Sequence, residues 1–157
     1  MKKVSITLLL LIALYPVFIA AASAWTEQER LIIDKANWFF NTSPKDKPRS
    51  IVNTGLQERL ENEGDKLLLL DVRNVRDFKD KRIKVRKGIT MVNIPQKDLF
   101  ADEKLKSMPK DKDIILICYT GGISSQMVPL LYMLGYRAIA LSGGIEEWDV
   151  QGLPLEK

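Results

Sequence analysis

The sequence predicts an α/β domain with a mainly parallel sheet. From residue 51 onward, short apolar runs alternate with segments whose apolar residues recur at helical spacing. Such alternation is typical of a sheet flanked by helices. The apolar runs are nearly continuous, which is the pattern of strands buried on both faces. These runs cover residues 67–70, 91–94, 114–117 and 138–141.

Helix candidates lie between these runs, and one more precedes the domain. Thr26 and Glu29 form a capping box, and apolar residues then recur at helical spacing, which predicts a helix over residues 27–41. The polar segment 44–50 follows it as a connector. We expect this helix to be an extension that packs on the domain. The other helix candidates span residues 54–63, 75–80, 97–107, 124–134 and 145–150.

Residues 1–24 have the composition of a secretory signal peptide. Lys2 and Lys3 precede an apolar run, and Ala22 and Ala24 form a small-residue site that suits a signal peptidase. We expect cleavage after Ala24 and export to the periplasm or the outside of the cell. The alternative is an uncleaved membrane anchor, because the run approaches the roughly 18 residues that span a bilayer. The chain then divides into a signal at 1–24, a helix and connector at 25–50, and a domain at 51–157.

The chain contains one cysteine and no histidine. A single cysteine cannot form a disulfide within the chain, so in an exported protein the thiol is free, paired between chains or used in chemistry. The lack of histidine excludes Ser-His-Asp and Cys-His catalysis and argues against a zinc site. We expect neither a metal nor an organic cofactor. The formal net charge of +4 includes Lys2 and Lys3, and so small an excess does not point to nucleic acid.

The most informative segment is the loop that follows the apolar run 114–117. Cys118 ends this run, and Gly121 and Gly122 follow before the next helix candidate. In parallel sheets, reactive groups gather at the carboxyl ends of strands, where the next helix offers unpaired amides. The glycines let the backbone turn sharply and point N–H groups at an anion such as a thiolate. We expect Cys118 to be reactive and exposed enough to alkylate; the alternative is a small buried hydrophobe that ends a strand.

Three motifs within residues 51–155 resemble those of the rhodanese family. The first comprises Leu68 to Arg73 with Asp77 and Phe78. The second is the loop that contains Cys118, Gly121, Ser124 and Ser125. The third comprises Leu141 to Ile145 with Trp148, Gly152 and Pro154.

The resemblance implies a five-stranded, mainly parallel sheet flanked by helices. It also implies that Cys118 accepts a sulfane sulfur as a persulfide and passes it to a thiophilic acceptor such as cyanide or a thiol. Asp71 and Arg73 would lie near the pocket, where we expect them to orient the loop more than to react. By the same resemblance, loop amides surround the persulfide, and these belong to Tyr119, Thr120, Gly121, Gly122, Ile123 and Ser124.

Two positions depart from the family's pattern. The loop has Ile123 where the family commonly has arginine, and Arg82-Ile83 stands where a His-Ile pair is usual. Loss of the loop arginine removes a bidentate clamp for anions. This departure argues against the related cysteine phosphatases and predicts weak turnover of thiosulfate. The basic run 73–87 is either a solvated face or a funnel for small anionic sulfur donors or an acidic partner.

We therefore predict an exported sulfurtransferase or sulfur carrier that acts through a Cys118 persulfide. Its expected partners are a small sulfur donor and a thiophilic acceptor, with no nucleic acid and with membrane contact only through the export signal; the sequence identifies no protein partner. One alternative is a rhodanese-like binding module without turnover, motivated by Ile123. Another is a redox protein with one active thiol, which the lack of a resolving cysteine disfavours.

Overall fold

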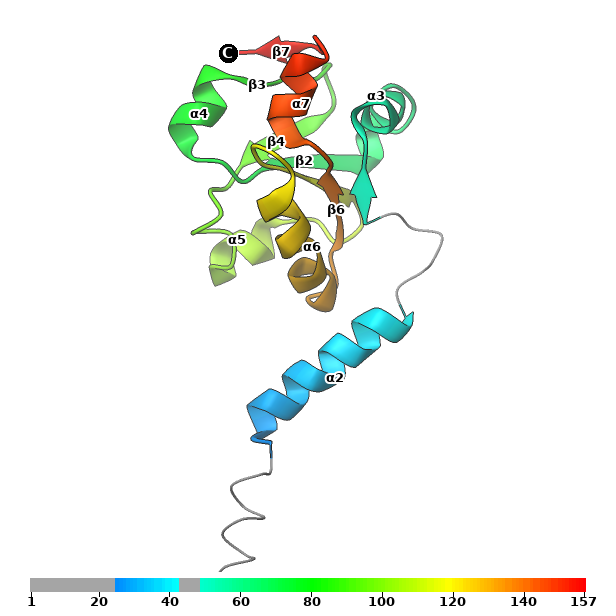
Figure 1. The fold of residues 1–157 in the computed structure, drawn as a ribbon, viewed down its shortest axis with the longest axis vertical. Coiled ribbons are helices and arrows are strands. Elements are labelled where there is room, and N and C mark those ends of the chain that lie inside the picture. Colours follow the sequence, from blue (N-terminus) through cyan, green and yellow to red (C-terminus); the bar gives the residue numbers. More distant parts are fainter. Residues whose placement is uncertain (1–24, 43–48) are drawn as a thin grey trace, which may run out of the picture. The chain divides into compact units, whose positions relative to one another are not determined.

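The computed structural model describes residues 25–42 and 49–157. The first range holds one helix, α2 (Glu27–Thr42), which confirms the predicted helix (Figure 1). Its capping box is formed, because the Glu29 amide donates to Thr26 Oγ1 at 3.2 Å and the Thr26 amide donates to Glu29 Oε2 at 2.8 Å. The helix and the domain are separate compact units, and the packing of one on the other stays a prediction. The expected signal peptide and most of the connector lie outside the described residues.

The domain contains a sheet of five parallel strands in the order β1-β6-β5-β2-β4 (Figure 1). All four apolar runs form strands, as predicted. The fifth strand, β1, has only two residues, too few to show a periodic pattern in the sequence. The strands are β1 (Ser50–Ile51), β2 (Leu67–Asp71), β4 (Thr90–Asn93), β5 (Asp113–Ile117) and β6 (Arg137–Leu141).

Helices connect these strands, and one differs from its expected range. The prediction of a helix over 97–107 is wrong at its beginning, because residues 97–101 form successive turns closed by Asp98 N–H to Pro95 O and Ala101 N–H to Asp98 O. The domain helices are α3 (Asn53–Asn62), α4 (Val75–Asp80), α5 (Asp102–Ser107), α6 (Gly122–Met133) and α7 (Gly144–Val150), with a short 3₁₀ turn, η1, at Gly64–Lys66. Across the described ranges, no helix combines the length and apolarity needed to cross a bilayer.

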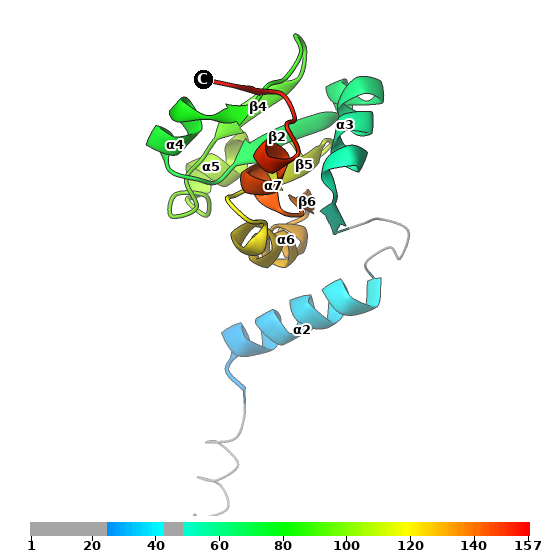
Figure 2. The same ribbon diagram turned by 45° about the horizontal axis from the view of Figure 1, so that its top comes forward.

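Side chains of the three central strands alternate between two apolar clusters, as the pleat of a strand requires. Leu70, Leu116 and Ala140 pack with α5 and α6, whereas Leu69 and Ile115 pack on the opposite face with α3 and α7. Figure 2 shows α6 and α7 on either side of β6. Both faces of the central strands are therefore buried, which explains their continuous apolar sequence.

A second, two-stranded antiparallel sheet joins β3 (Arg82–Ile83) to β7 (Leu155–Glu156). Arg82 Nε lies 3.0 Å from Glu156 Oε1 across this pair. The Trp148 indole N–H donates to Pro154 O at 3.1 Å, so the segment before β7 is tied to α7. The sequence did not predict this sheet, because its strands are too short for any periodicity.

The parallel register brings the carboxyl ends of β2 and β5 together. Asp71 pairs with Ile117, and the Val72 amide donates to Ile117 O at 2.9 Å. Arg73, two residues after β2, and Cys118, the residue after β5, therefore lie near each other at one edge of the sheet. This edge contains the candidate site.

Candidate active site

Cys118 lies at the bottom of a pocket at the carboxyl edge of the sheet. The pocket has a volume of about 410 Å³. The Cys118 side chain is buried, with only 3% of the residue exposed, but it lines the pocket, so a reagent must enter the pocket to reach the sulfur. Alkylation of the folded protein stays a prediction. The lining residues are Val72, Arg73, Asn74, Pro95, Gln96, Lys97, Cys118, Tyr119 and Ile123.

Two groups of the loop contact the sulfur atom. The Gly121 amide donates to Cys118 Sγ at 3.2 Å, and Ser124 Oγ lies 3.5 Å from it. Gly121 has a φ of +88° and lies against the backbone of residues 141–143, where a Cβ would be 2.9 Å from Leu141 O. Ser124 Oγ also donates to Gly121 O at 3.0 Å. The backbone turn that only glycine adopts easily therefore points an N–H group at the sulfur.

The N-terminus of α7 fixes the direction of the loop peptides. Ile145 and Glu146 donate their backbone N–H groups to the carbonyls of Cys118 and Tyr119, each at 3.0 Å. In a trans peptide the N–H points opposite to the C=O. The amides of Tyr119 and Thr120 consequently point away from α7, toward the face of the sheet on which α6 packs. Cys118 belongs to the apolar cluster on that face, so these amides are directed to the side of the sulfur.

Gly144 makes this close contact between loop and helix possible. Its φ is +57°, and a Cβ at this position would overlap the carbonyl oxygens of Cys118 and Tyr119, at 2.5 Å from the former. Any side chain here would push the loop away from α7. The glycine pair Gly143-Gly144 of the closing motif thus serves the cysteine loop directly.

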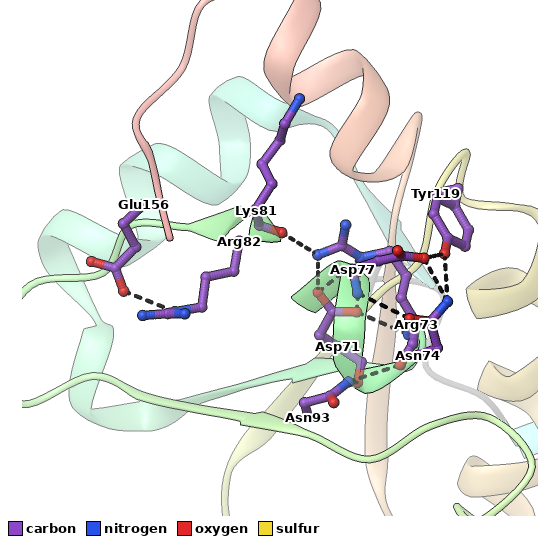
Figure 3. Close-up of polar contacts among 9 residues, drawn as sticks. All are labelled: Asp71, Arg73, Asn74, Asp77, Lys81, Arg82, Asn93, Tyr119 and Glu156. Atoms are coloured by element: carbon purple, nitrogen blue, oxygen red, sulfur yellow. Dashed lines mark hydrogen bonds and ion pairs between the residues drawn. The ribbon is translucent and has the colours of Figure 1, made fainter. Parts of the chain in front are cut away.

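Asp71 and Arg73 form a buried ion pair beside the pocket (Figure 3). Arg73 donates from Nη2 to Asp71 Oδ2 at 2.6 Å and from Nε to Asp71 Oδ1 at 3.0 Å, and its Nη2 also donates to Lys81 O at 2.6 Å. Asn93 Nδ2 donates to the backbone oxygens of both residues of the pair at 2.9 Å. The guanidinium charge is therefore matched by a carboxylate, and its Nε and Nη2 atoms are engaged in structural hydrogen bonds.

Tyr119 closes one side of the pocket through a hydrogen-bonded cluster with α4 (Figure 3). Its hydroxyl donates to Asp77, and Asn74 Nδ2 donates to the Tyr119 hydroxyl oxygen at 3.3 Å. Asn74 also caps α4 by accepting from the Asp77 amide at 2.9 Å. The hydrogen bond from Tyr119 lowers the pKa of the Asp77 carboxyl, and the same bond raises the pKa of Tyr119.

Most cations of the basic run 73–87 lie outside the set of pocket-lining residues. Arg73 is its only cation among the pocket-lining residues. Elsewhere in the run, Lys81 pairs with Asp149 and Arg82 with Glu156, and Arg86 Nη2 donates to Glu61 O at 2.6 Å. Several of these cations therefore stabilise the fold, and the expectation of a donor funnel has no support from their positions.

The structure brings most of the predicted site residues together. Cys118, Tyr119, Ile123 and Arg73 line the pocket, Gly121 and Ser124 contact the sulfur, and Asp71 lies behind Arg73. Thr120 and Gly122 complete the loop and are exposed. Within the described residues, no group of three or more His, Cys, Asp or Glu side chains could hold a metal.

Sequence reasoning missed the contribution of residues 95–97 to the pocket. A signal was available, because β4 also ends at the carboxyl edge, where polar residues become candidates for binding. These residues were not considered because a helix was expected to begin at residue 97. Asn74, at the beginning of α4, was missed as well.

Comparison with known proteins agrees with the observed fold. Residues 53–151 match the rhodanese-like domain family. A protein of Allochromatium vinosum named sulfurtransferase is 31% identical over 106 residues, which cover 67% of this chain and 92% of that protein. A crystal structure of a rhodanese-related protein from Thermoplasma volcanium matches at 30% identity and a TM-score of 0.57, covering 69% of this chain and 97% of that one. The rhodanese-like domain from Anabaena, solved by NMR, gives 27% identity and a TM-score of 0.57, with coverages of 69% and 78%.

A parallel α/β sheet whose central strand is followed by a cysteine and a glycine-containing loop defines a class of α/β domains with a site at the carboxyl edge of the sheet. The match extends over more than half of the chain and includes most of the three motifs noted in the sequence. The chain belongs to the rhodanese-like domain family, and its fold is the rhodanese-like α/β fold.

Gly144→Ala is expected to displace the cysteine loop. The left-handed backbone costs alanine about 1 to 2 kcal/mol, and the overlap with the two carbonyls adds about 1 to 3 kcal/mol. Gly152→Ala is the matched control, because Gly152 has a φ of +68° and no atom lies within 4 Å of the point that a Cβ would occupy. Urea unfolding should therefore show a larger decrease in the free energy of unfolding for Gly144→Ala than for Gly152→Ala. Equal decreases for the two variants would contradict the close contact between the cysteine loop and the N-terminus of α7.

Tyr119→Phe is expected to raise the pKa of Asp77 toward its ordinary value, because the hydroxyl that stabilises the carboxylate is removed. A carboxyl whose pKa is lowered by folding stabilises the protein above its unfolded pKa, and this contribution is lost as pH falls through the folded pKa. The stability difference between wild type and variant should therefore narrow on acidification. NMR titration of the Asp77 carboxyl and urea unfolding at several pH values measure both effects; an unchanged Asp77 titration would refute the assignment.

Proposed function

We propose that this protein is a sulfurtransferase or sulfur carrier that uses a Cys118 persulfide. The observation that carries the proposal is the position of Sγ, at the bottom of a pocket and 3.2 Å from an inward-pointing amide. A buried anion needs hydrogen-bond donors, and the loop supplies them without histidine. The name of the Allochromatium relative supports the same class of activity.

The proposed chemistry moves one sulfur atom in two displacement steps. The Cys118 thiolate attacks the terminal sulfur of a hydropersulfide R–S–SH, the donor S–S bond breaks, and R–S⁻ leaves as Cys118–S–SH forms. In the second step a thiophilic acceptor attacks the outer sulfur and regenerates the Cys118 thiolate; with cyanide and the ionised persulfide, the products are thiocyanate and the thiolate. Neither step needs a cofactor or an external oxidant.

The composition of the pocket favours persulfide or polysulfide donors over thiosulfate. Ile123 lines the pocket and is 38% exposed, at the loop position where a guanidinium would bind a compact dianion. Arg73, the nearby guanidinium, is already paired with Asp71. A donor with a smaller negative charge than thiosulfate loses less binding free energy when this guanidinium is missing from the pocket.

Ile123 also motivates a second candidate, a rhodanese-like binding module without turnover. In that case Cys118 would be a buried structural residue, as its 3% exposure allows. The two candidates differ in whether the sulfur can be loaded and unloaded in the folded protein.

Loading of Cys118 distinguishes these candidates. Intact mass spectrometry after incubation with polysulfide should show the addition of sulfur, and cyanide should remove it. Cys118→Ser should show no adduct, since a hydroxyl cannot carry sulfane sulfur, while its melting temperature stays close to that of wild type because the two side chains nearly match in size. A wild-type protein that never gains sulfur while folded would support the binding module instead.

Ile123→Arg is expected to increase thiosulfate turnover by restoring an anion clamp at the rim of the pocket. Ile123→Gln is the control, because it adds a polar chain without charge. Steady-state assays with thiosulfate and cyanide should show a gain for arginine alone. High wild-type activity that neither change alters would mean that Ile123 does not limit the use of thiosulfate.

We also propose export of the protein through residues 1–24, on the evidence of their composition. The mature chain should begin at Trp25 and accumulate outside the cytoplasm of the producing cell. N-terminal sequencing of the fractionated protein tests this. A chain that retains Met1 and stays in the membrane fraction would support the uncleaved anchor.

A further inference from the structure

The pocket above Cys118 is lined by two cations and by no carboxylate. Of its lining residues, only Arg73 and Lys97 carry a basic or acidic side chain. Arg73 is 5% exposed and is held by Asp71 and by Lys81 O. Asp71 therefore matches the charge of Arg73 and occupies its Nε and Nη2 atoms, whereas Lys97 is the cation of this pocket for which no ion pair is found among the described residues.

The backbone around Lys97 is held at the pocket by hydrogen bonds to the end of β2. The Ile94 amide donates to Asp71 O at 3.1 Å and the Gln96 amide donates to Val72 O at 2.9 Å. The next turn is closed by the Asp98 amide and Pro95 O at 2.8 Å. The position of Lys97 is thus set by the same strand that carries the Asp71–Arg73 pair.

The side chain of Lys97 is free to meet an anion. It is exposed, and none of the ion pairs found within residues 25–42 and 49–157 involves it. Ile123, which lines the same pocket, contributes no charge. An anion that enters this pocket therefore has one unpaired positive group to interact with.

We propose that Lys97 is the specificity-determining residue that recognises the negative charge of the sulfur donor, so that the protein prefers a singly charged persulfide or polysulfide to a neutral donor. This inference rests on the proposed function. Lys97 acts on binding and approach and takes no part in breaking the S–S bond. It supplies one positive charge from the connection between β4 and α5, without the bidentate geometry of the arginine that the cysteine loop lacks.

The first experiment reads the charge at Cys118 without any sulfur transfer. Iodoacetate and iodoacetamide are nearly equal in size and differ in charge, and both alkylate a thiolate with release of iodide. The second-order rate constant for iodoacetate divided by that for iodoacetamide is measured with full-length protein. This ratio should be about fivefold lower in Lys97→Gln than in wild type, which is the scale of one partly exposed ion pair. Lys97→Arg should retain the ratio. Lys87→Gln is the matched control, since Lys87 is exposed and is not among the pocket-lining residues.

Salt provides a second arm of this experiment. Charge recognition at an exposed lysine is screened as ionic strength rises, so the difference between wild type and Lys97→Gln should shrink at high salt. A ratio that is the same in Lys97→Gln and wild type at low salt would overturn the assignment of Lys97.

A sulfur-transfer assay tests the same residue on donors. In Lys97→Gln, KM for thiosulfate, a dianion, should rise more than KM for a singly charged alkyl persulfide, and kcat should change little for either, because charge recognition contributes equally to bound substrate and transition state. An equal change for both donors would contradict a role in reading charge. If no donor loads wild-type Cys118, the proposed function fails, while the alkylation ratios still decide whether Lys97 acts on anions.

Discussion

The site depends on two hydrogen bonds between the cysteine loop and the N-terminus of α7. They fix the carbonyls of Cys118 and Tyr119 on Ile145 and Glu146, and the planarity of the peptide bond then orients the loop amides toward the sulfur side. Gly144 permits the close approach. The unpaired N–H groups of a short helix are thus satisfied by the loop, and the loop in return is held in an anion-binding conformation.

A second layer of contacts supports this arrangement from β2. The buried Asp71–Arg73 pair is linked through Arg73 to the backbone of Lys81, and the Lys81 ammonium pairs with Asp149 of α7 at 2.5 Å. A buried ion pair stabilises when its hydrogen-bonding groups are also satisfied, and here the Arg73 amide donates to Asp71 Oδ1 while Lys81 O accepts from the guanidinium. The first motif and the closing motif are therefore parts of one connected structure around the cysteine.

The sequence predicted those parts of the fold whose pattern is local. Continuous apolarity identified β2, β4, β5 and β6, because strands buried on both faces leave a strong signal. β1, β3 and β7 have two residues each and exist only through pairing with distant segments. The beginning of α5 was placed too early because hydrogen bonds to β2, invisible in the sequence, hold residues 94–96. In the site, Cys118 and Asp71 could be predicted because reactive groups gather at the carboxyl ends of parallel strands. The burial of the thiol could not, because it depends on packing with α6. Lys97 was missed because a helix was expected over residues 97–107.

Residues 153–156, which include β7, are connected through α7 to the loop that contains Cys118. The Leu153 amide donates to Trp148 O, and the Trp148 indole donates to Pro154 O, each at 3.1 Å. Pro154 O also accepts from the Lys84 amide at 3.1 Å, beside the β3–β7 pair. The carboxyl end of α7 is thereby clamped, while its amino end holds the cysteine loop. Because α7 connects the two regions, a change in residues 153–156 that weakens these hydrogen bonds is expected to loosen the loop that contains Cys118.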